Sequence, residues 1–182
     1  LPTGAGKSIV YQLAGLIQPG MTLVVDPLTA LMEDQIEGLR KNGIDRVVGI
    51  SAQTTKKNQT DQILSTIREG DAFFALVAPE RFQITKFREA IKELSEFAPI
   101  NLVVVDEAHC ISEWGHDFRP AYLNIGKVIR KRCTGQVNAF PPPILALTGT
   151  ASRAVLKDLK YQLEFDLDEN RPDITPDSFD RE

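Results

Sequence analysis

Two short segments of the sequence carry residue types that suit phosphate chemistry, and the first lies at residues 3–8. It reads Thr-Gly-Ala-Gly-Lys-Ser. The glycines let consecutive backbone N–H groups turn toward an anion. The lysine can reach phosphate oxygens, and the serine hydroxyl can help to hold Mg²⁺. We therefore predict that the phosphates of a nucleotide cofactor are bound by Thr3, Gly4, Ala5, Gly6, Lys7 and Ser8, with Lys7 also counted as catalytic.

The second segment, Asp106-Glu107-Ala108-His109, follows the apolar run at 101–105. A carboxylate at the end of a buried strand can hold the Mg²⁺ of a nucleotide, so Asp106 and the Ser8 hydroxyl are the predicted metal ligands. Glu107 is placed to orient and polarise a water for attack on the γ-phosphate. Taken alone, this segment could be a solvated turn, and residues 3–8 could be a surface loop. Together they predict a nucleoside triphosphatase.

The choice of nucleotide rests on a further pattern. Guanine-specific enzymes carry an (Asn/Thr)-Lys-x-Asp signature, and none follows any predicted strand of this chain. Small-molecule kinases also have phosphate loops, but Asp-Glu-Ala-His is not their usual acidic motif. We therefore expect ATP and Mg²⁺ as the bound groups.

The elements that must position these residues are short apolar strands. Several are apolar almost throughout, as expected for strands that are buried on both faces of a parallel sheet. Ligands of such sheets lie at the carboxyl ends of the strands, where both acidic and hydroxyl candidates occur. The predicted strands are 22–26, 47–51, 73–78, 101–106 and 144–148.

Helical patterns alternate with these strands. Helices are expected over 29–41, over 85–96, after Ser152 and after Ser8. Gly43 is a candidate C-terminal cap for the first of them. The alternation predicts one α/β domain over residues 1–165 with a mostly parallel central sheet flanked by helices. The polar, proline-containing stretch 166–182 is predicted to be a linker.

The composition is that of a water-soluble globular chain. The 182 residues carry a formal net charge of -4, which argues weakly against a surface that binds any polyanion. We interpret the basic cluster Lys127, Arg130, Lys131 and Arg132 as a solvated helix face. Cys110 and Cys133 are expected to be free thiols. No apolar run approaches the roughly 18 residues that a bilayer span requires, so no membrane contact is expected.

A longer stretch identifies a family. Residues 106–122, DEAHCISEWGHDFRPAY, strongly resemble the RecQ family of superfamily 2 DNA helicases, including its aromatic-rich loop. Other segments resemble family motifs in the same order: LPTGAGKS at 1–8, VVDPLTALMEDQ at 24–35, VAPERF at 77–82, ALTGTAS at 146–152 and SFDRE at 178–182. An apolar residue commonly leads the first motif of this family, which accounts for Leu1. Gly149 departs from the pattern, since the family usually has Ala there.

The resemblance implies a role for each motif. The chain would be the first RecA-like lobe of an ATP-dependent 3′-to-5′ DNA helicase, a P-loop NTPase domain. His109, counted with the catalytic residues, would couple the ATP site to Thr148 and Thr150 of motif III. The loop would sense single-stranded DNA through Trp114, Phe118, Arg119 and Tyr122. Core packing is the alternative for Trp114 and Phe118, although the loop around them is polar.

The resemblance also implies partners. Single-stranded and forked DNA are expected, together with a second RecA-like lobe beyond residue 182 that supplies an arginine finger, and a glutamine motif before residue 1. The isolated chain would then hydrolyse ATP weakly. The protein would act in the bacterial cytoplasm or nucleoid, or in the eukaryotic nucleus. Two alternatives stay open: a DNA translocase or remodelling ATPase that does not unwind, and a non-catalytic module that binds nucleotide and DNA.

Overall fold

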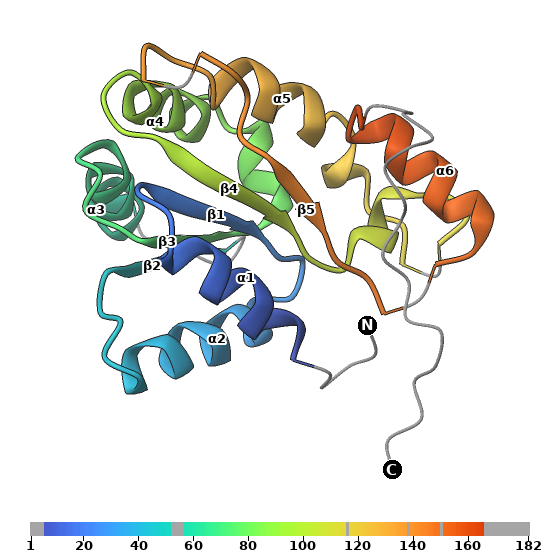
Figure 1. The fold of residues 1–182 in the computed structure, drawn as a ribbon, viewed down its shortest axis with the longest axis horizontal. Helices are drawn as coiled ribbons and strands as arrows, with labels where there is room; N and C mark the ends of the chain where they lie inside the picture. Colours follow the sequence, from blue (N-terminus) through green and yellow to red (C-terminus); the bar gives the residue numbers. More distant parts are fainter. Residues whose placement is uncertain (1–5, 52–56, 116, 138, 150, 166–182) are drawn as a thin grey trace.

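In the part of the chain that the structure describes, five parallel strands form a central sheet (Figure 1). The computed structural model describes residues 6–51, 57–115, 117–137, 139–149 and 151–165. The strands pair in the order β2-β3-β1-β4-β5, and every pairing is parallel. The bounds are β1 Met21–Val25, β2 Val47–Ile50, β3 Phe74–Val77, β4 Ile100–Val105 and β5 Ile144–Ala146. The predicted parallel α/β fold is confirmed. The proposed linker 166–182 lies outside the described residues.

Within the described residues, six α-helices flank the sheet: α1 Lys7–Leu16, α2 Thr29–Lys41, α3 Lys57–Arg68, α4 Thr85–Ser95, α5 Ile125–Arg132 and α6 Arg153–Gln162. Helix α2 has the predicted bounds, and Gly43 follows it with φ of 79°, a left-handed conformation that suits glycine. Helix α3 was missed by the sequence prediction, because the first half of KNQTDQILSTIR contains no apolar residue. None of the helices in the described part of the chain is long and apolar enough to cross a membrane.

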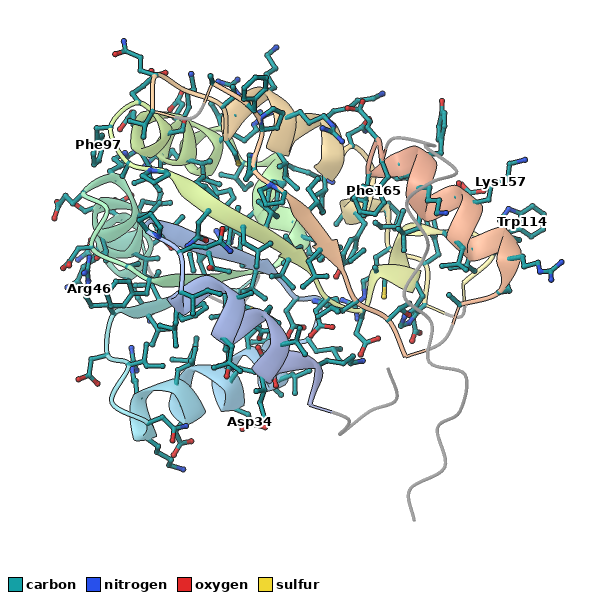
Figure 2. All side chains as sticks on the ribbon, viewed as in Figure 1. Asp34, Arg46, Phe97, Trp114, Lys157 and Phe165 are labelled. Atoms are coloured by element: carbon teal, nitrogen blue, oxygen red, sulfur yellow. The ribbon has the colours of Figure 1, made fainter. Side chains whose placement is uncertain are left out.

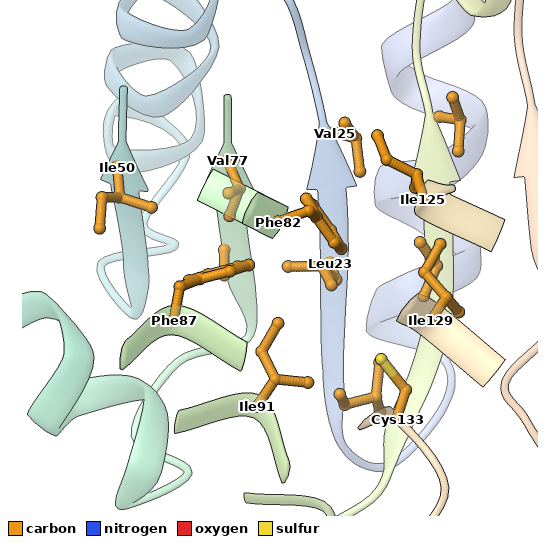
Figure 3. Packing of buried hydrophobic residues seen from close by; sticks show 14 of the residues in the cluster. Leu23, Val25, Ile50, Val77, Phe82, Phe87, Ile91, Ile125, Ile129 and Cys133 are labelled. Atoms are coloured by element: carbon orange, nitrogen blue, oxygen red, sulfur yellow. The ribbon is translucent and has the colours of Figure 1, made fainter. Parts of the chain in front are cut away.

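The sheet is covered on both faces, which explains its continuous apolar strands. Alternate residues of each strand point to opposite faces. Leu23 and Val25 of β1 belong to the core cluster under α3, α4, α5 and α6, whereas Val24 belongs to the cluster under α1 and α2. Figure 3 shows the first cluster, where side chains of α4 and α5 such as Phe87 and Ile129 meet the strands.

The two cysteines lie inside this packing and are free thiols, as predicted. Cys133 belongs to the cluster between α5 and the sheet (Figure 3). Burial raises the pKa of Cys110 to about 11 and the pKa of Cys133 to about 12. Both sulfurs are therefore protonated at neutral pH and serve as apolar packing groups.

Helix α1 lies close to the sheet at its C-terminal half. An added Cβ at Gly15 would lie 2.3 Å from Thr22 Oγ1, so only glycine permits this approach. The buried Asn101 fastens the same end, since its Nδ2 donates to the carbonyl oxygens of Gly15 and Gln18, both at 3.1 Å. Thr22 Oγ1 in turn donates to Asn101 Oδ1 at 2.8 Å. The opposite end of α1 begins at Lys7 and is thereby held against the carboxyl ends of the strands.

This contact predicts opposite effects of the same substitution at two helical glycines. Gly15→Ala should lower the free energy of unfolding by about 1–3 kcal/mol, because the new methyl group overlaps Thr22. Gly38→Ala in α2 should raise it by about 0.5–1 kcal/mol, because nothing lies within 4 Å of the added Cβ and alanine favours the helix. Urea unfolding of both variants measures this difference. Equal effects at the two sites would contradict the close approach of α1.

Candidate nucleotide site

The predicted site lies where β1 and β4 end side by side. Val25 pairs with Val105, so the next residue of each strand is a carboxylate, Asp26 or Asp106. Asp106 N donates to the carbonyl oxygen of Val25 at 2.9 Å, which continues the pairing to the last position. Both side chains are buried, with 0% of Asp26 and 3% of Asp106 exposed. Parallel strands therefore deliver two acidic groups to one point.

Lys7, the first residue of α1, meets Glu107 across the end of the sheet. Its Nζ lies 3.2 Å from Glu107 Oε1, and the side chains are only 10% and 20% exposed. These residues are 100 positions apart in the sequence, and the two segments predicted to act together are in contact. Lys7 also exerts a favourable charge on Asp106. The cation of the phosphate loop thus lies among the acidic residues that follow β4.

Glu107 has an unusual backbone. Its φ of 45° and ψ of 46° place a non-glycine residue in the left-handed region, which costs on the order of 1–3 kcal/mol and persists only where neighbours enforce it. Three contacts enforce it here: Glu107 N donates to Asp106 Oδ1 at 2.9 Å, Ala108 N donates to Leu147 O at 2.9 Å, and the carboxylate holds Lys7. The strain directs the Glu107 side chain toward α1.

His109 joins this cluster to the segment after β5. Its Nδ1 lies 3.0 Å from Thr148 Oγ1 and 3.2 Å from Glu107 Oε2. The structure therefore places Glu107, His109 and Thr148 in one chain of polar contacts. Thr150, the other predicted coupling residue, lies outside the described residues, as do Thr3, Gly4 and Ala5 of the predicted phosphate loop.

The described residues fit ATP and Mg²⁺. Gly6 precedes α1 in a left-handed conformation with φ of 78°, and no side chain caps the helix, so its first N–H groups suit a phosphate. Lys7 supplies the positive charge. The hydroxyl of Ser8 and the carboxylate of Asp106 are hard oxygen donors of the kind that Mg²⁺ prefers. Burial raises the pKa of Asp106 above its usual range, and a cation at this carboxylate would oppose that effect.

Sequence reasoning missed a second polar group at the same edge. Tyr11 OH donates to Gln35 Oε1, Gln35 Nε2 donates to Asp26 Oδ2 at 3.3 Å, and Leu28 N donates to Asp26 Oδ1 at 2.8 Å. Burial raises the pKa of Asp26 to about 7, and the nearby Asp106 adds to the effect. The one sequence signal for Asp26 was that it follows an apolar strand, as Asp106 does, but no second acidic residue stands beside it.

The aromatic-rich loop divides into exposed and anchored residues. Trp114 is 78% exposed and projects from the edge of the molecule (Figure 2), whereas Phe118 is half-buried. Arg119 Nη1 donates to the carbonyl oxygen of Pro27 at 2.9 Å. Tyr122 is buried, and its hydroxyl donates to the carbonyl oxygen of Asp106 at 3.0 Å. Of the four residues predicted to sense DNA, Trp114 is the most open to a ligand and Tyr122 faces inward.

The sequence of this chain is similar to those of known proteins. A family model described as DEAD/DEAH box helicase matches residues 1–159. The probable ATP-dependent DNA helicase RecS of Bacillus subtilis is 41% identical over 164 residues, which cover 90% of this chain and 30% of that protein. The ATP-dependent DNA helicase RecQ of Pasteurella multocida is 38% identical over 182 residues, which cover 100% of this chain and 26% of that protein. The predicted resemblance is confirmed, and the chain spans less than a third of these relatives.

Solved structures give the same fold. The helicase domain of Pyrococcus furiosus Hef superposes with a TM-score of 0.63 at 17% identity, covering 91% of this chain and 32% of that one. A hypothetical ATP-dependent RNA helicase from Sulfolobus tokodaii superposes with a TM-score of 0.61 at 22% identity, covering 91% and 44%. At these identities the likeness shows the fold alone.

The raised pKa of Asp26 predicts a pH-dependent stability. An acid with a raised pKa stabilises the fold in its protonated form. This contribution is fully present below about pH 4, the usual pKa of an aspartate, and is lost as the pH rises through about 7. Asp26→Asn should therefore be more stable than the wild type at pH 8, by about 1–3 kcal/mol, and nearly equal to it at pH 4.

Urea unfolding of the chain at both pH values, with a metal chelator present, measures this effect. Asp34→Asn, which removes an exposed carboxylate from α2, controls for the change in net charge. A stability difference between Asp26→Asn and wild type that stayed constant from pH 4 to pH 8 would contradict the prediction.

Proposed function

Because the chain belongs to the DEAD/DEAH box helicase family, we propose that it is the ATP-binding motor lobe of an ATP-dependent DNA helicase. The protein couples ATP hydrolysis to 3′-to-5′ movement along single-stranded DNA and to unwinding of the duplex. One observation carries this proposal: Lys7 and Glu107, from motifs 100 residues apart, meet at 3.2 Å beside Asp106 at the carboxyl ends of the strands. The similarity to relatives named RecQ and RecS supports DNA as the substrate.

Each residue of the site has a defined task in this function. Lys7 and the first N–H groups of α1 bind the phosphates, and Ser8 with Asp106 holds Mg²⁺. The metal, when bound, neutralises charge on the phosphate oxygens. Glu107 orients the attacking water and accepts its proton. His109 carries the state of Glu107 to Thr148, since it contacts both side chains.

The aromatic-rich loop supplies the DNA contact. Aromatic rings stack on unpaired bases of any sequence, and the 78% exposure of Trp114 leaves its ring open to them. Phe118 and Arg119 extend the same surface. We assign Tyr122 to the connection behind the loop, because it is buried and its hydroxyl binds the carbonyl oxygen of Asp106.

Further parts of the proposal concern the whole protein. Single-stranded and forked DNA are the proposed substrates. A second RecA-like lobe supplies an arginine finger to the γ-phosphate, which is worth about 10³–10⁵ in rate in related phosphoryl transfers. We propose that the protein acts in the cytoplasm or nucleoid if it is bacterial, and in the nucleus if it is eukaryotic. We propose residues 1–165 as the lobe and 166–182 as a linker toward the second lobe.

Substitutions in the site should separate binding from hydrolysis in the full-length protein. Glu107→Gln should lower kcat for ATP about 10²- to 10⁴-fold, because the amide cannot accept the proton of the attacking water. ATP affinity should stay close to that of the wild type. Lys7→Ala should weaken ATP binding about 10- to 100-fold, because charge-assisted hydrogen bonds to phosphate are lost.

The assay combines DNA-stimulated ATP turnover, strand separation on a forked duplex with a 3′ tail, and binding of a fluorescent ATP analogue. Lys41→Ala on the exposed surface of α2 is the matched control for Lys7→Ala. Turnover that survived both site substitutions would reject the assignment. ATP turnover on DNA without strand separation would favour a translocase.

Removal of the exposed indole tests the loop. Trp114→Ala should raise the concentration of single-stranded DNA needed for half-maximal ATPase stimulation about 10- to 100-fold, because base stacking contributes about 1–3 kcal/mol. Phe118→Ala should act in the same direction, with thermal unfolding measured in parallel because this ring is half-buried. Phe140→Ala removes an aromatic ring that is 82% exposed elsewhere and should change nothing. Full DNA stimulation in both loop variants would exclude the sensing role.

A further inference from the structure

The turn Asp26–Leu28, which joins β1 to α2, receives contacts from both candidate binding regions. On one side, Asp26 accepts a hydrogen bond from Gln35 Nε2 at 3.3 Å, and Gln35 accepts one from Tyr11 OH. Tyr11 lies on α1, one turn after Lys7 and Ser8. A rigid helix therefore connects the phosphate-binding residues to this hydroxyl.

On the other side, the aromatic-rich loop holds the same turn. Arg119 Nη1 donates to the carbonyl oxygen of Pro27 at 2.9 Å, and Arg119 N donates to the carbonyl oxygen of Cys110 at 2.9 Å. Arg119 follows Phe118 directly and lies five residues after Trp114. The loop is therefore hydrogen-bonded to the carbonyl oxygen of Pro27, the residue that follows Asp26.

Burial fixes the hydrogen-bond partners of Asp26 and Tyr11. Asp26 is 0% exposed and Tyr11 is 1% exposed, so neither can exchange its partner for water. The carboxylate of Asp26 already holds Leu28 N at 2.8 Å through its other oxygen. In the arrangement observed, the Gln35 amide lies between the two groups, since its Nε2 donates to Asp26 Oδ2 and its Oε1 accepts from Tyr11 OH.

We propose that Tyr11, Gln35 and Asp26 form a positioning relay between the phosphate-binding helix α1 and the turn that Arg119 holds from the aromatic-rich loop. DNA binding at the loop shifts this turn, and the relay passes the shift to α1, where Lys7 and Ser8 lie. The three residues touch neither nucleotide nor DNA in this role. This inference rests on the proposed function, because it requires a protein whose ATP turnover responds to DNA.

The test uses the full-length protein with poly(dT) as the DNA and measures ATP turnover with and without it. Tyr11→Phe removes the hydroxyl and keeps the ring, and Gln35→Leu removes both hydrogen bonds of the amide. Each should lower the stimulation by DNA, the ratio of the two rates, about 3- to 10-fold, the equivalent of one lost hydrogen bond. ATP affinity and turnover without DNA should stay within a factor of two or so of wild type.

Three further variants make the result specific. Tyr161→Phe and Gln62→Leu make the same chemical changes at exposed sites of α6 and α3, and both should keep the full stimulation. Asp26→Asn retains a carbonyl oxygen for Leu28 N and an amide that can pair with a rotated Gln35, so it should also keep most of the stimulation. Asp26→Leu breaks both contacts and should lose it.

The outcomes distinguish the relay from the function on which it rests. If the wild type is stimulated by DNA and Tyr11→Phe and Gln35→Leu are stimulated equally, the relay is wrong and the proposed function stands. If the variants lose turnover equally with and without DNA, their role is structural and the relay is again wrong. If the wild type shows no stimulation at all, both proposals fall. The relay is supported if Tyr11→Phe, Gln35→Leu and Asp26→Leu lose stimulation by DNA selectively and Asp26→Asn keeps it.

Discussion

The site depends on the pairing of β1 with β4 in a parallel sheet. Both strands are buried on both faces, so the polar Thr22 and Asn101 inside them hydrogen-bond to each other, and the carboxylates follow the carboxyl ends of the strands. The pairing of Val25 with Val105 then brings Asp26 and Asp106 to adjacent positions. The cost of two buried carboxylates is reduced by backbone N–H groups, since Leu28 N and Glu107 N each donate to one of them. The pairing of β1 with β4 therefore sets the positions of the segments that contain Asp26 and Asp106.

Local strain and long-range contact support each other at Glu107. A left-handed backbone at a glutamate is unfavourable by itself, yet it turns the side chain toward Lys7 and His109, which both contact its oxygens. The same short segment ends the sheet at Asp106 and starts the aromatic-rich loop at Cys110. The acidic residues, His109 and the loop therefore lie on one continuous segment that follows β4.

The aromatic-rich loop combines a free tip with a fixed base. Trp114 is exposed, whereas Arg119 and Tyr122 bind the carbonyl oxygens of Pro27 and Asp106 at the ends of β1 and β4. Two hydrogen bonds therefore attach the segment that follows Trp114 to the ends of β1 and β4.

The sequence by itself determined the type of the five strands and of helices α1, α2, α4 and α6, and it indicated the chemistry of the site. Continuous apolar runs predicted buried parallel strands, helix α2 was predicted to the residue, and the phosphate loop with Asp106 and Glu107 indicated ATP chemistry. Helix α3 escaped prediction, because its apolar residues occupy only its second half, and Asp26 escaped because one carboxylate after a strand has no distinctive neighbour in the sequence. Only the tertiary structure decided the strand order, the strained backbone of Glu107, the inward position of Tyr122 and the contact of Tyr11 with Gln35. The physical reason is that the residues of a strand with two apolar faces do not specify which strands lie beside it. Contacts between residues as far as 100 positions apart therefore follow from the packing of the whole sheet.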